Sequence, residues 1–401
     1  MPVLKIKTTT LFMIIYCAIM FLPNYFSNSF TQLLSNLIVV IAVLFLLKIR
    51  YKPSLFITLM GFYQLYLILI TYINKTNTAD IHLIISNCKI FFFLCVIDYM
   101  LKRKQKDITN IIFYILLIFV ALDFFSIVFF PDGLYSTSLT WNEWSTSYEA
   151  QWIFGNKNNR IYWYIILIMT AWERHVINGK SKFWPTVISI ITIFTMILVK
   201  SSTATTVAVI VGIGILVSVY KKKELRLNIN TYVLVGICFV VTLMILAGAA
   251  SFLRPIVEGI FNKDMTFSNR SQVWLQAVLL IIQKPLFGWG VTDSENATEL
   301  LGSLTFVNAH NQILNCLWQG GIILFIVFLF IMLCTAKNIN LISSGKYKIV
   351  FQSIMVGLMV DMMFEVILGT NATWVCLLLL NSIYCFSEKQ KEFYFARSQN
   401  E

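Results

Sequence analysis

The sequence is poor in charge: Asp, Glu, Lys and Arg make up only 12% of its 401 residues, against roughly 25% in an average soluble protein. Hydrophobic residues make up 58%, and the mean hydropathy is +0.77. This composition excludes a soluble domain, a disordered chain and a nucleic-acid-binding protein. A bilayer-spanning helix needs about 20 mostly apolar residues, so we expect an all-α polytopic membrane protein.

Patterns that would hold a metal ion or a disulfide framework are also missing. The eight cysteines lie in apolar stretches, and none forms a Cys-x-x-Cys pair. The sequence has no Asp-x-Asp, Asp-x-Asn or His-Glu-x-x-His motif and no glycine-rich phosphate loop. A divalent metal requires several converging oxygen ligands. We therefore expect no metal and no other cofactor.

Apolar segments of membrane-spanning length recur along the whole chain, which we interpret as one integral membrane domain over 1–401. The sixth and twelfth segments are short enough to tilt or re-enter the membrane. The twelve expected spans are 8–26, 31–49, 54–73, 81–101, 108–130, 160–177, 183–200, 203–220, 231–252, 311–335, 347–368 and 370–387.

Lysine and arginine gather in every second connecting segment, for example in 102–106 and 221–226. Cytoplasmic loops carry such an excess in multi-pass proteins. We therefore expect a protein of the cytoplasmic membrane with both termini in the cytoplasm. The net charge of +12 then reports topology and indicates no nucleic-acid partner.

Two external segments, 131–159 and 253–310, are too long to be simple connectors. The first is rich in Trp, Tyr, Ser and Asn, a composition that suits either sugar rings or an interfacial aromatic belt. Within the second, 270–283 places three glutamines on one helical stripe, with apolar residues elsewhere. This pattern predicts a helix lying in the membrane interface.

Two basic side chains at the outer boundary are candidates for chemistry. Arg270 opens the expected interfacial helix, where its guanidinium and the free backbone N–H groups can bind one phosphate. Anchoring the helix to lipid head groups is the alternative. His310 stands at the start of a span, and imidazole can act as a general base toward a hydroxyl near neutral pH. A solvated interfacial histidine is the alternative there.

Acidic residues inside a predicted span are costly and suggest function. Asp361 and Glu365 share one helix face in the outer half of the eleventh span. They are candidates for orienting a base or binding sugar hydroxyls. They are equally candidates for ion pairs with Lys89, Lys200 or Arg160.

These residues belong to motifs that together resemble the core signature of the O-antigen ligase and Wzy-type polymerase superfamily. In that family an Arg and a Trp precede a P-x-x-G-x-G turn, and a His-Asn pair opens a glycine-containing span. The matching stretches are Asn269-Arg270-Ser271-x-x-Trp274, Pro285-Leu286-x-Gly288-x-Gly290, His310-Asn311, Gly320-Gly321 and Gly155-Asn156-x-Asn158.

The resemblance implies a metal-independent, membrane-embedded glycosyltransferase with a GT-C-like fold and an undecaprenyl-diphosphate-linked glycan as donor. By the same resemblance, Arg270 binds the donor diphosphate and His310 activates the acceptor hydroxyl. The other residues expected to bind substrate are Asn156, Asn158, Trp274, Asn311, Asp361 and Glu365.

The sequence departs from the family pattern at one place. Many members carry Ser-Arg-(Thr/Gly)-Ala near the start of a middle span, whereas this chain has Ser-Ser-Thr-Ala over 201–204. Lys200, Arg160 and Arg254 are candidates for the missing charge. We favour Arg160, because it directly follows the Gly155-Asn156-x-Asn158 segment.

We expect a polymerase of lipid-linked repeat units in capsule or O-antigen synthesis, acting at the outer face of the membrane. A chain-length regulator is a further candidate partner. The alternatives are a ligase that moves a finished glycan to another acceptor, and a flippase or transporter of the lipid-linked glycan. The halves of the sequence share no segment pattern, which disfavours a transporter built from inverted repeats.

Overall fold

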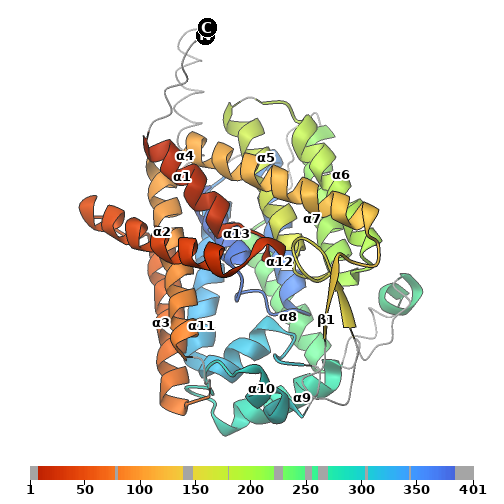
Figure 1. Ribbon diagram of the computed structural model, residues 1–401. Coiled ribbons are helices and arrows are strands. Elements are labelled where there is room, and N and C mark those ends of the chain that lie inside the picture. The colour runs from red at the N-terminus through yellow and green to blue at the C-terminus, as the bar shows by residue number, and fades with distance from the viewer. Residues whose placement is uncertain are drawn as a thin grey trace, which may run out of the picture.

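The computed structural model describes residues 8–76, 80–138, 148–178, 180–220, 229–248, 255–260, 270–302, 306–342 and 345–383. Over these ranges the chain forms a bundle of helices and one small sheet (Figure 1). The elements are α1 (Thr8–Met20), η1 (Asn24–Phe26), α2 (Ser29–Lys48), α3 (Leu55–Asn74), α4 (Asp80–Phe129), β1 (Tyr135–Ser138), β2 (Tyr148–Gln151), α5 (Ile161–Asn178), α6 (Phe183–Leu198), α7 (Ser202–Tyr220), α8 (Thr231–Leu246), η3 (Pro255–Ile260), α9 (Arg270–Gln283), α10 (Ser294–Leu301), α11 (Gln312–Asn340), α12 (Gly345–Met362) and α13 (Asn371–Ser382).

A helix lies in every expected span, as a polytopic helical membrane protein requires, but α12 ends at Met362, so 363–368 of the eleventh expected span are not helical. In the described chain, six helical segments are long and apolar enough to cross a membrane, and α1, α6 and α8 are shorter apolar helices. The number of crossings therefore stays a prediction. The six segments are Ser29–Lys48, Leu55–Asn74, Ile81–Arg103, Lys106–Phe129, Ser202–Tyr220 and Gln312–Asn340.

The fourth and fifth expected spans are not separated by a loop. Both lie in α4, which bends where 81–101 gives way to 108–130 (Figure 1). The connecting residues are mostly Lys, Arg and Gln, which are strong helix formers, and no glycine or proline interrupts them. The charge of 102–106 predicted a loop, but in the structure this segment continues the helix.

The described part of the last expected span, 370–387, holds a short helix, and 384–387 lie outside the described residues. Helix α13 has 12 residues, or about 18 Å at 1.5 Å per residue, which is less than the roughly 30 Å of a hydrocarbon core. Every residue from Ala372 to Leu380 is buried, and α13 lies in the middle of the bundle (Figure 1). A helix that is apolar all round is packed inside a protein, and α13 is packed in this way.

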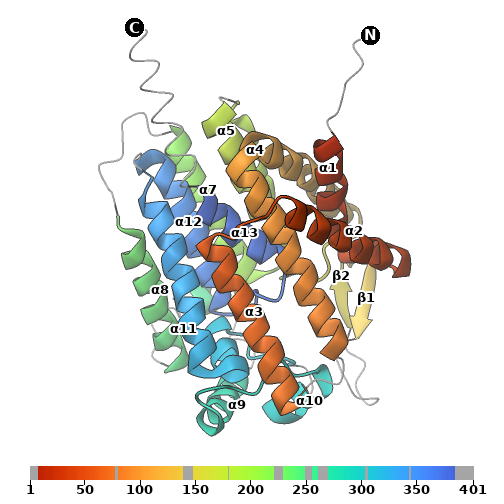
Figure 2. The same cartoon turned by 90° about the vertical axis from the view of Figure 1, so that its left-hand side faces the viewer.

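The first external segment contains an antiparallel hairpin that the all-α expectation did not include. Strands β1 and β2 pair in a register that sets Tyr135 opposite Gln151 and Ser138 opposite Tyr148. Tyrosine and threonine, which both favour strands, occur in this short run. The hairpin sits beside the helical bundle and leads the chain into α5 (Figure 2).

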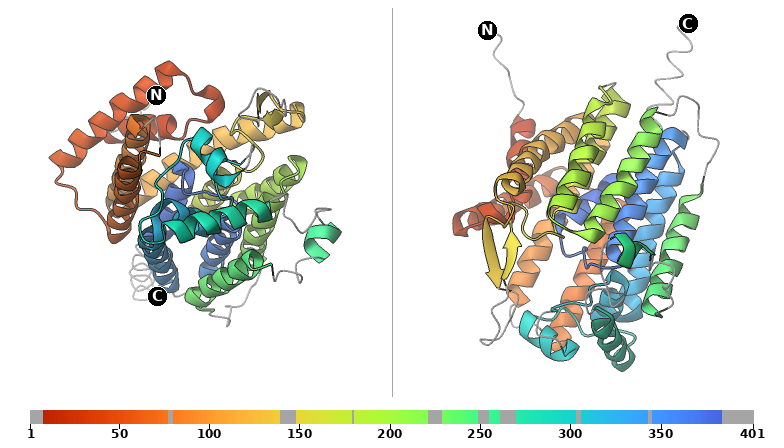
Figure 3. Two further views of the ribbon diagram at one scale, coloured as in Figure 1. Left: turned by 90° about the horizontal axis from the view of Figure 1, so that it is seen from below. Right: turned by 90° about the vertical axis from the view of Figure 1, so that its right-hand side faces the viewer.

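Helix α9 has the bounds expected for the interfacial helix, and α10 adds a second short helix that was not expected. Both lie across the end of the bundle that is opposite the start of α1 (Figures 2 and 3). Trp274 and Ala277 face the interior, whereas Leu275 and Ile282 are exposed. This two-sided pattern suits a helix at a membrane surface, although its position relative to a membrane stays a prediction.

Two glycine motifs pack directly against each other. Helix α11 is broken at Gly321, whose φ of 60° and ψ of −163° are not helical. At this break the Trp289 N–H donates to the Trp318 carbonyl at 2.9 Å, and the Gly290 N–H donates to Gln319 at 2.8 Å. A Cβ on Gly288 would lie 2.5 Å from the backbone nitrogen of Gly320. Glycine is therefore required because two backbones meet here.

Candidate active site

The carboxylate of Glu365, in the loop between α12 and α13, is the meeting point of three distant segments. Its Oε1 accepts hydrogen bonds from Nη2 of Arg270 at 2.6 Å and from Nδ2 of Asn158 at 2.8 Å. Its Oε2 lies 3.3 Å from Nδ1 of His310. The side chains of Arg270, His310 and Glu365 are 14%, 19% and 11% exposed. Three residues expected from separate motifs thus share one carboxylate that is only slightly open to the outside.

Asn158 links this carboxylate to the start of α7. The Ser201 hydroxyl donates to Oδ1 of Asn158 at 2.8 Å, while the amide nitrogen of Asn158 bonds Glu365. The neighbouring Asn156 has a different part: its Oδ1 accepts from the backbone N–H groups of Asn158 and Asn159 at 3.1 and 3.0 Å. Asn156 therefore shapes the loop, and Asn158 makes the contact.

His310 is held in an unusual backbone conformation. Its φ of 44° lies in the left-handed region, which residues other than glycine rarely adopt and which stores strain. Its backbone N–H donates to Oδ1 of Asn308 at 2.8 Å, and its ring meets the Phe306 ring edge to face at 4.9 Å. Nδ1 faces Glu365 without the alignment of a hydrogen bond. Catalytic contacts are often loose before substrate binds.

Asn311 and Gln312 hold the loop that carries the carboxylate. Asn311 is fully buried, caps α11, and donates from Nδ2 to the Met363 carbonyl at 2.9 Å. Oε1 of Gln312 accepts from the N–H groups of Ile367 and Leu368 at 2.9 and 3.1 Å. Asn311, expected to bind substrate, is therefore placed as a positioning residue. Gln312 was not expected, and only its polarity in an apolar span marked it.

Asp361 does not join the contacts of Glu365. The two residues are joined through the backbone, because the Glu365 N–H donates to the Asp361 carbonyl at 2.8 Å. The Asp361 side chain is buried, and its Oδ2 has no hydrogen-bond partner among the described residues. The two carboxylates were expected to share one helix face, but α12 ends at Met362, so Asp361 lies in the last turn of the helix and Glu365 in the loop that follows.

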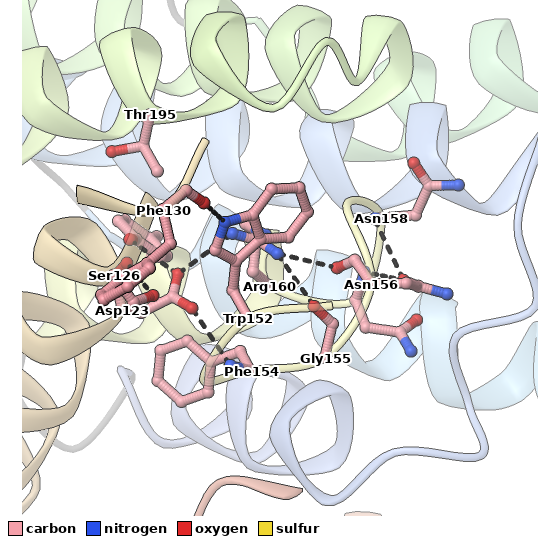
Figure 4. Close-up of polar contacts among 12 residues, drawn as sticks. Asp123, Ser126, Phe130, Trp152, Phe154, Gly155, Asn156, Asn158, Arg160 and Thr195 are labelled. Carbon is pink, nitrogen blue, oxygen red and sulfur yellow. Dashed lines mark hydrogen bonds and ion pairs between the residues drawn. The ribbon is translucent and has the colours of Figure 1, made fainter. Parts of the chain in front are cut away.

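Arg160, the favoured second cation, is enclosed by the protein (Figure 4). Its Nη1 lies 3.4 Å from Oδ2 of Asp123, and both side chains have no exposed surface. Nη2 donates to the carbonyls of Gly155 and Asn156 at 3.0 and 3.2 Å, and the guanidinium lies over the Trp152 ring. This placement argues against a contact with diphosphate, because the guanidinium is directed to groups inside the protein.

The remaining expected residues are dispersed. Lys200 is exposed in the turn between α6 and α7, with a φ of 55°, and directly precedes Ser201. Trp274 is packed in the core on the inner face of α9. Arg254 lies outside the described residues. Lys200 is therefore the described candidate that keeps an exposed cation beside a residue of the Asn158 network.

The β1–β2 hairpin carries one carboxylate that the sequence analysis did not single out. Glu149 lies in β2, and partial burial raises its pKa above the usual value, while the charge of Lys157 opposes the rise. Nothing in the sequence of this short strand distinguishes Glu149 from a glutamate in an ordinary surface hairpin.

The chemistry that this arrangement supports is specific. A guanidinium can hold an anion, and a carboxylate that faces Nδ1 of an imidazole leaves Nε2 to accept a proton. Within the described ranges, no group of three or more His, Cys, Asp or Glu side chains is arranged to hold a metal ion. The site suits a reaction in which a hydroxyl loses a proton while an anionic group is held nearby.

Part of the chain is similar to a known protein family. Residues 187–329 match a family model described as O-antigen ligase. The matched stretch includes Arg270, the turn over 285–290 and His310, but it includes neither Asn158 nor Glu365. No curated protein matches the chain.

Proposed function

We propose that the protein is a membrane-embedded glycosyltransferase that polymerises lipid-linked oligosaccharide repeat units, and the match of residues 187–329 to a family model described as O-antigen ligase supports this. The donor is a glycan on undecaprenyl diphosphate, and the acceptor is a second lipid-linked repeat unit. The reaction takes place at the outer face of the cytoplasmic membrane, in capsule or O-antigen synthesis. The observation that carries the proposal is the convergence of Arg270 and His310 on Glu365.

The reaction is a substitution at the anomeric carbon of the donor sugar. The oxygen of an acceptor hydroxyl forms the new glycosidic bond, while the bond between the anomeric carbon and the phosphate oxygen breaks. The lipid diphosphate leaves with that electron pair. The proton of the acceptor hydroxyl passes to Nε2 of His310, since Nδ1 faces Glu365 at 3.3 Å.

Arg270 stabilises the leaving diphosphate in this proposal. A guanidinium has five N–H donors, and the described contact with Glu365 uses Nη2. The first turn of α9, which begins at Arg270, adds backbone N–H groups that favour an anion. Fixed donors aimed at the charge that develops in the transition state are usually the largest single contribution to catalysis.

Glu365 acts as a positioning residue. Its negative charge balances Arg270 and faces Nδ1 of His310, so the imidazole keeps Nε2 free for the acceptor. Asn158 donates to the same Oε1 of the carboxylate as Arg270, and Ser201 in turn donates to Asn158. The carboxylate thus couples the group that binds the leaving group to the group that takes the proton.

Lys200 is our candidate for the second cation that shares the diphosphate charge. It is exposed and directly precedes Ser201, whose hydroxyl bonds Asn158. A lysine ammonium is a compact point charge that can pair with a phosphate without a fixed fork geometry. This assignment replaces Arg160, which is enclosed with Asp123.

A ligase is the second candidate function, because the matching family model is described as O-antigen ligase. The donor chemistry is the same, and the acceptor differs. Loss of a polymerase leaves single lipid-linked repeat units, whereas loss of a ligase leaves long lipid-linked polymer. Analysis of the lipid-linked glycans that accumulate in a deletion strain therefore separates the two functions.

The proposal is tested with purified protein in liposomes and lipid-linked repeat units as substrate. We expect His310→Ala to reduce turnover by about 100- to 10,000-fold, the usual loss on removing a general base. His82→Ala is the matched control, because His82 is exposed on α4. We expect a chelator to leave turnover unchanged. Near-normal polymer from His310→Ala would remove this residue from the mechanism.

A further inference from the structure

Lys89 is a basic residue within an apolar segment of α4. The proposed chemistry does not use Lys89. Its Nζ donates to the Ser35 hydroxyl of α2 at 2.8 Å. Among the residues that the structure describes, none of the ion pairs involves Lys89. A cation in a membrane segment is costly, and such residues usually face a cavity and mark a path for substrates or ions.

Lys89 lines a polar cavity of about 140 Å³ where α1, α2, α4 and the start of α13 meet. Figure 2 shows α1 and α2 beside α4 on this side of the bundle. The amide and hydroxyl side chains of the cavity come from Asn24, Ser27, Thr31, Gln32, Ser35 and Asn371. Such groups can exchange hydrogen bonds with the hydroxyls of a sugar.

A second cavity of about 310 Å³ continues from the first. Asn24 and Asn371 line both, so the two volumes adjoin. The second cavity also reaches Asn159 and Thr370. A volume near 300 Å³ is at the lower end of the range of ligand-binding pockets.

Two residues that line the second cavity are close in sequence to residues of the candidate active site. Asn159 follows Asn158, whose amide bonds Glu365. Thr370 lies in the same loop as Glu365, just before α13. Arg270 comes to Glu365 from α9, which packs against α10 and α11. The helices that line the cavities therefore differ from α9, which carries the Arg270 expected to bind the donor diphosphate.

We propose that the two cavities bind the glycan of the acceptor and that the Lys89 ammonium pairs with an anionic group on it. This inference rests on the proposed glycosyltransferase function. The anion is either a phosphate at the reducing end or an acidic group within the glycan, and an ammonium recognises both as a point charge. The acceptor hydroxyl then lies at His310, and the rest of the glycan extends past Asn159 and Asn371 toward Lys89.

The test uses purified protein in liposomes, a lipid-linked donor and two water-soluble acceptors. One acceptor is the repeat unit as a methyl glycoside, and the other is the repeat unit as a glycosyl 1-phosphate. We expect Lys89→Gln to raise the KM for acceptor by about ten- to a hundredfold, as for a lost hydrogen bond to a charged group, with little change in kcat. Lys106→Gln, an exposed lysine on the same helix, is the matched control.

The two acceptors distinguish the sources of the anion. A rise in KM for the glycosyl phosphate alone assigns Lys89 to a phosphate, and a rise for both acceptors assigns it to an acidic group in the glycan. An unchanged KM for both, with normal wild-type turnover, overturns the inference and leaves the proposed function intact, as expected if the cavity holds only a lipid head group. Absence of wild-type turnover overturns the proposed function itself.

A structural role of Lys89 is separated by the thermal stability of the protein without substrate. Removing a cation that pairs with no carboxylate in the described part of the chain should leave the unfolding midpoint of Lys89→Gln equal to or above that of the wild type. A lower midpoint together with a lower kcat and an unchanged KM would show that Lys89 only joins α2 to α4, and would overturn the inference.

Discussion

Two arginine–carboxylate pairs of this protein differ in what surrounds them. Arg160 and Asp123 lie 3.4 Å apart with no exposed surface on either side chain. Arg270 and Glu365 lie 2.6 Å apart, and both side chains keep some exposure. The same two chemical groups thus form one closed pair and one open pair.

The partners of each pair explain the difference. In the closed pair, the guanidinium of Arg160 also binds the carbonyls of Gly155 and Asn156, so it fastens the segment before α5 to α4. In the open pair, the carboxylate of Glu365 is shared with His310 and Asn158. A charge that is enclosed stabilises the fold, whereas a charge whose side chain keeps some exposure is available to a ligand.

Breaking the closed pair should have the largest effect. Arg160→Ala leaves Asp123 buried without its cation, and breaking a buried ion pair on one side costs about 3–5 kcal/mol. This is a large part of the net stability of a typical protein. We expect little protein in the membrane fraction, measured by immunoblot, and a lower unfolding midpoint for what remains. Wild-type abundance would contradict the assignment of Arg160 to the fold.

Breaking the open pair should remove activity and spare the protein. We expect Arg270→Ala to reduce turnover about 100- to 1,000-fold, as for loss of a donor to a developing anion, at near-normal abundance. Arg270→Lys keeps the charge but loses the planar fork, so most activity should still be lost. Wild-type-like turnover by Arg270→Lys in liposomes would indicate that the residue only anchors α9 to lipid head groups, since lysine also reaches them.

Neutralising the shared carboxylate tests whether Glu365 positions the reacting groups. Glu365→Gln keeps an oxygen for Arg270 and Asn158 but removes the charge that faces His310. We expect kcat to fall by about 100-fold, the lower end of the range for loss of a general base, with a smaller change in KM. An Asp361→Asn variant serves as the comparison, and an equal loss there would show that the whole region around the end of α12, and not Glu365 in particular, is sensitive.

The smallest effect is expected from changes at Asn158 and Ser201, which connect the open pair to the start of α7. Asn158→Ala removes one hydrogen bond to a charged partner, which is worth about 1.5 kcal/mol or more, or roughly tenfold in turnover. Ser201→Ala should cost less, because its hydroxyl acts on Glu365 through the amide of Asn158 and otherwise accepts from the Ala204 N–H. Turnover of the two variants and of the double variant shows whether they act together. Independent, additive losses would contradict a shared network.

Local patterns predicted the helices well and their connections poorly. The bounds of α9 follow from an amphipathic stripe that begins at Arg270, and apolar length located the helices of the bundle. The continuity of α4 through 102–106 could not be predicted from charge, because the same lysines suit a cytoplasmic loop and a helix. The β1–β2 hairpin depends on pairing between residues on either side of the 139–147 segment.

The motifs predicted which residues matter without showing how they meet. Gly288 and Gly321 belonged to separate motifs, and only the packing of one backbone on the other shows why both are glycine. Arg270 and His310 were candidates from their positions at the outer boundary. Glu365 was left between orienting a base and pairing with Lys89, Lys200 or Arg160, and in the structure it contacts Arg270 and faces His310.

The sequence by itself determined the class of the protein, because apolar length and scarce charge are properties of each segment taken alone. It also marked Arg270 and His310, whose neighbours in the chain carry the motifs. Only the tertiary structure decided that Arg160 is enclosed with Asp123 while Arg270 shares Glu365 at the surface. Burial and ion pairing arise from contacts between segments, and Arg270 is 95 residues away from Glu365 along the chain, beyond the reach of any local pattern.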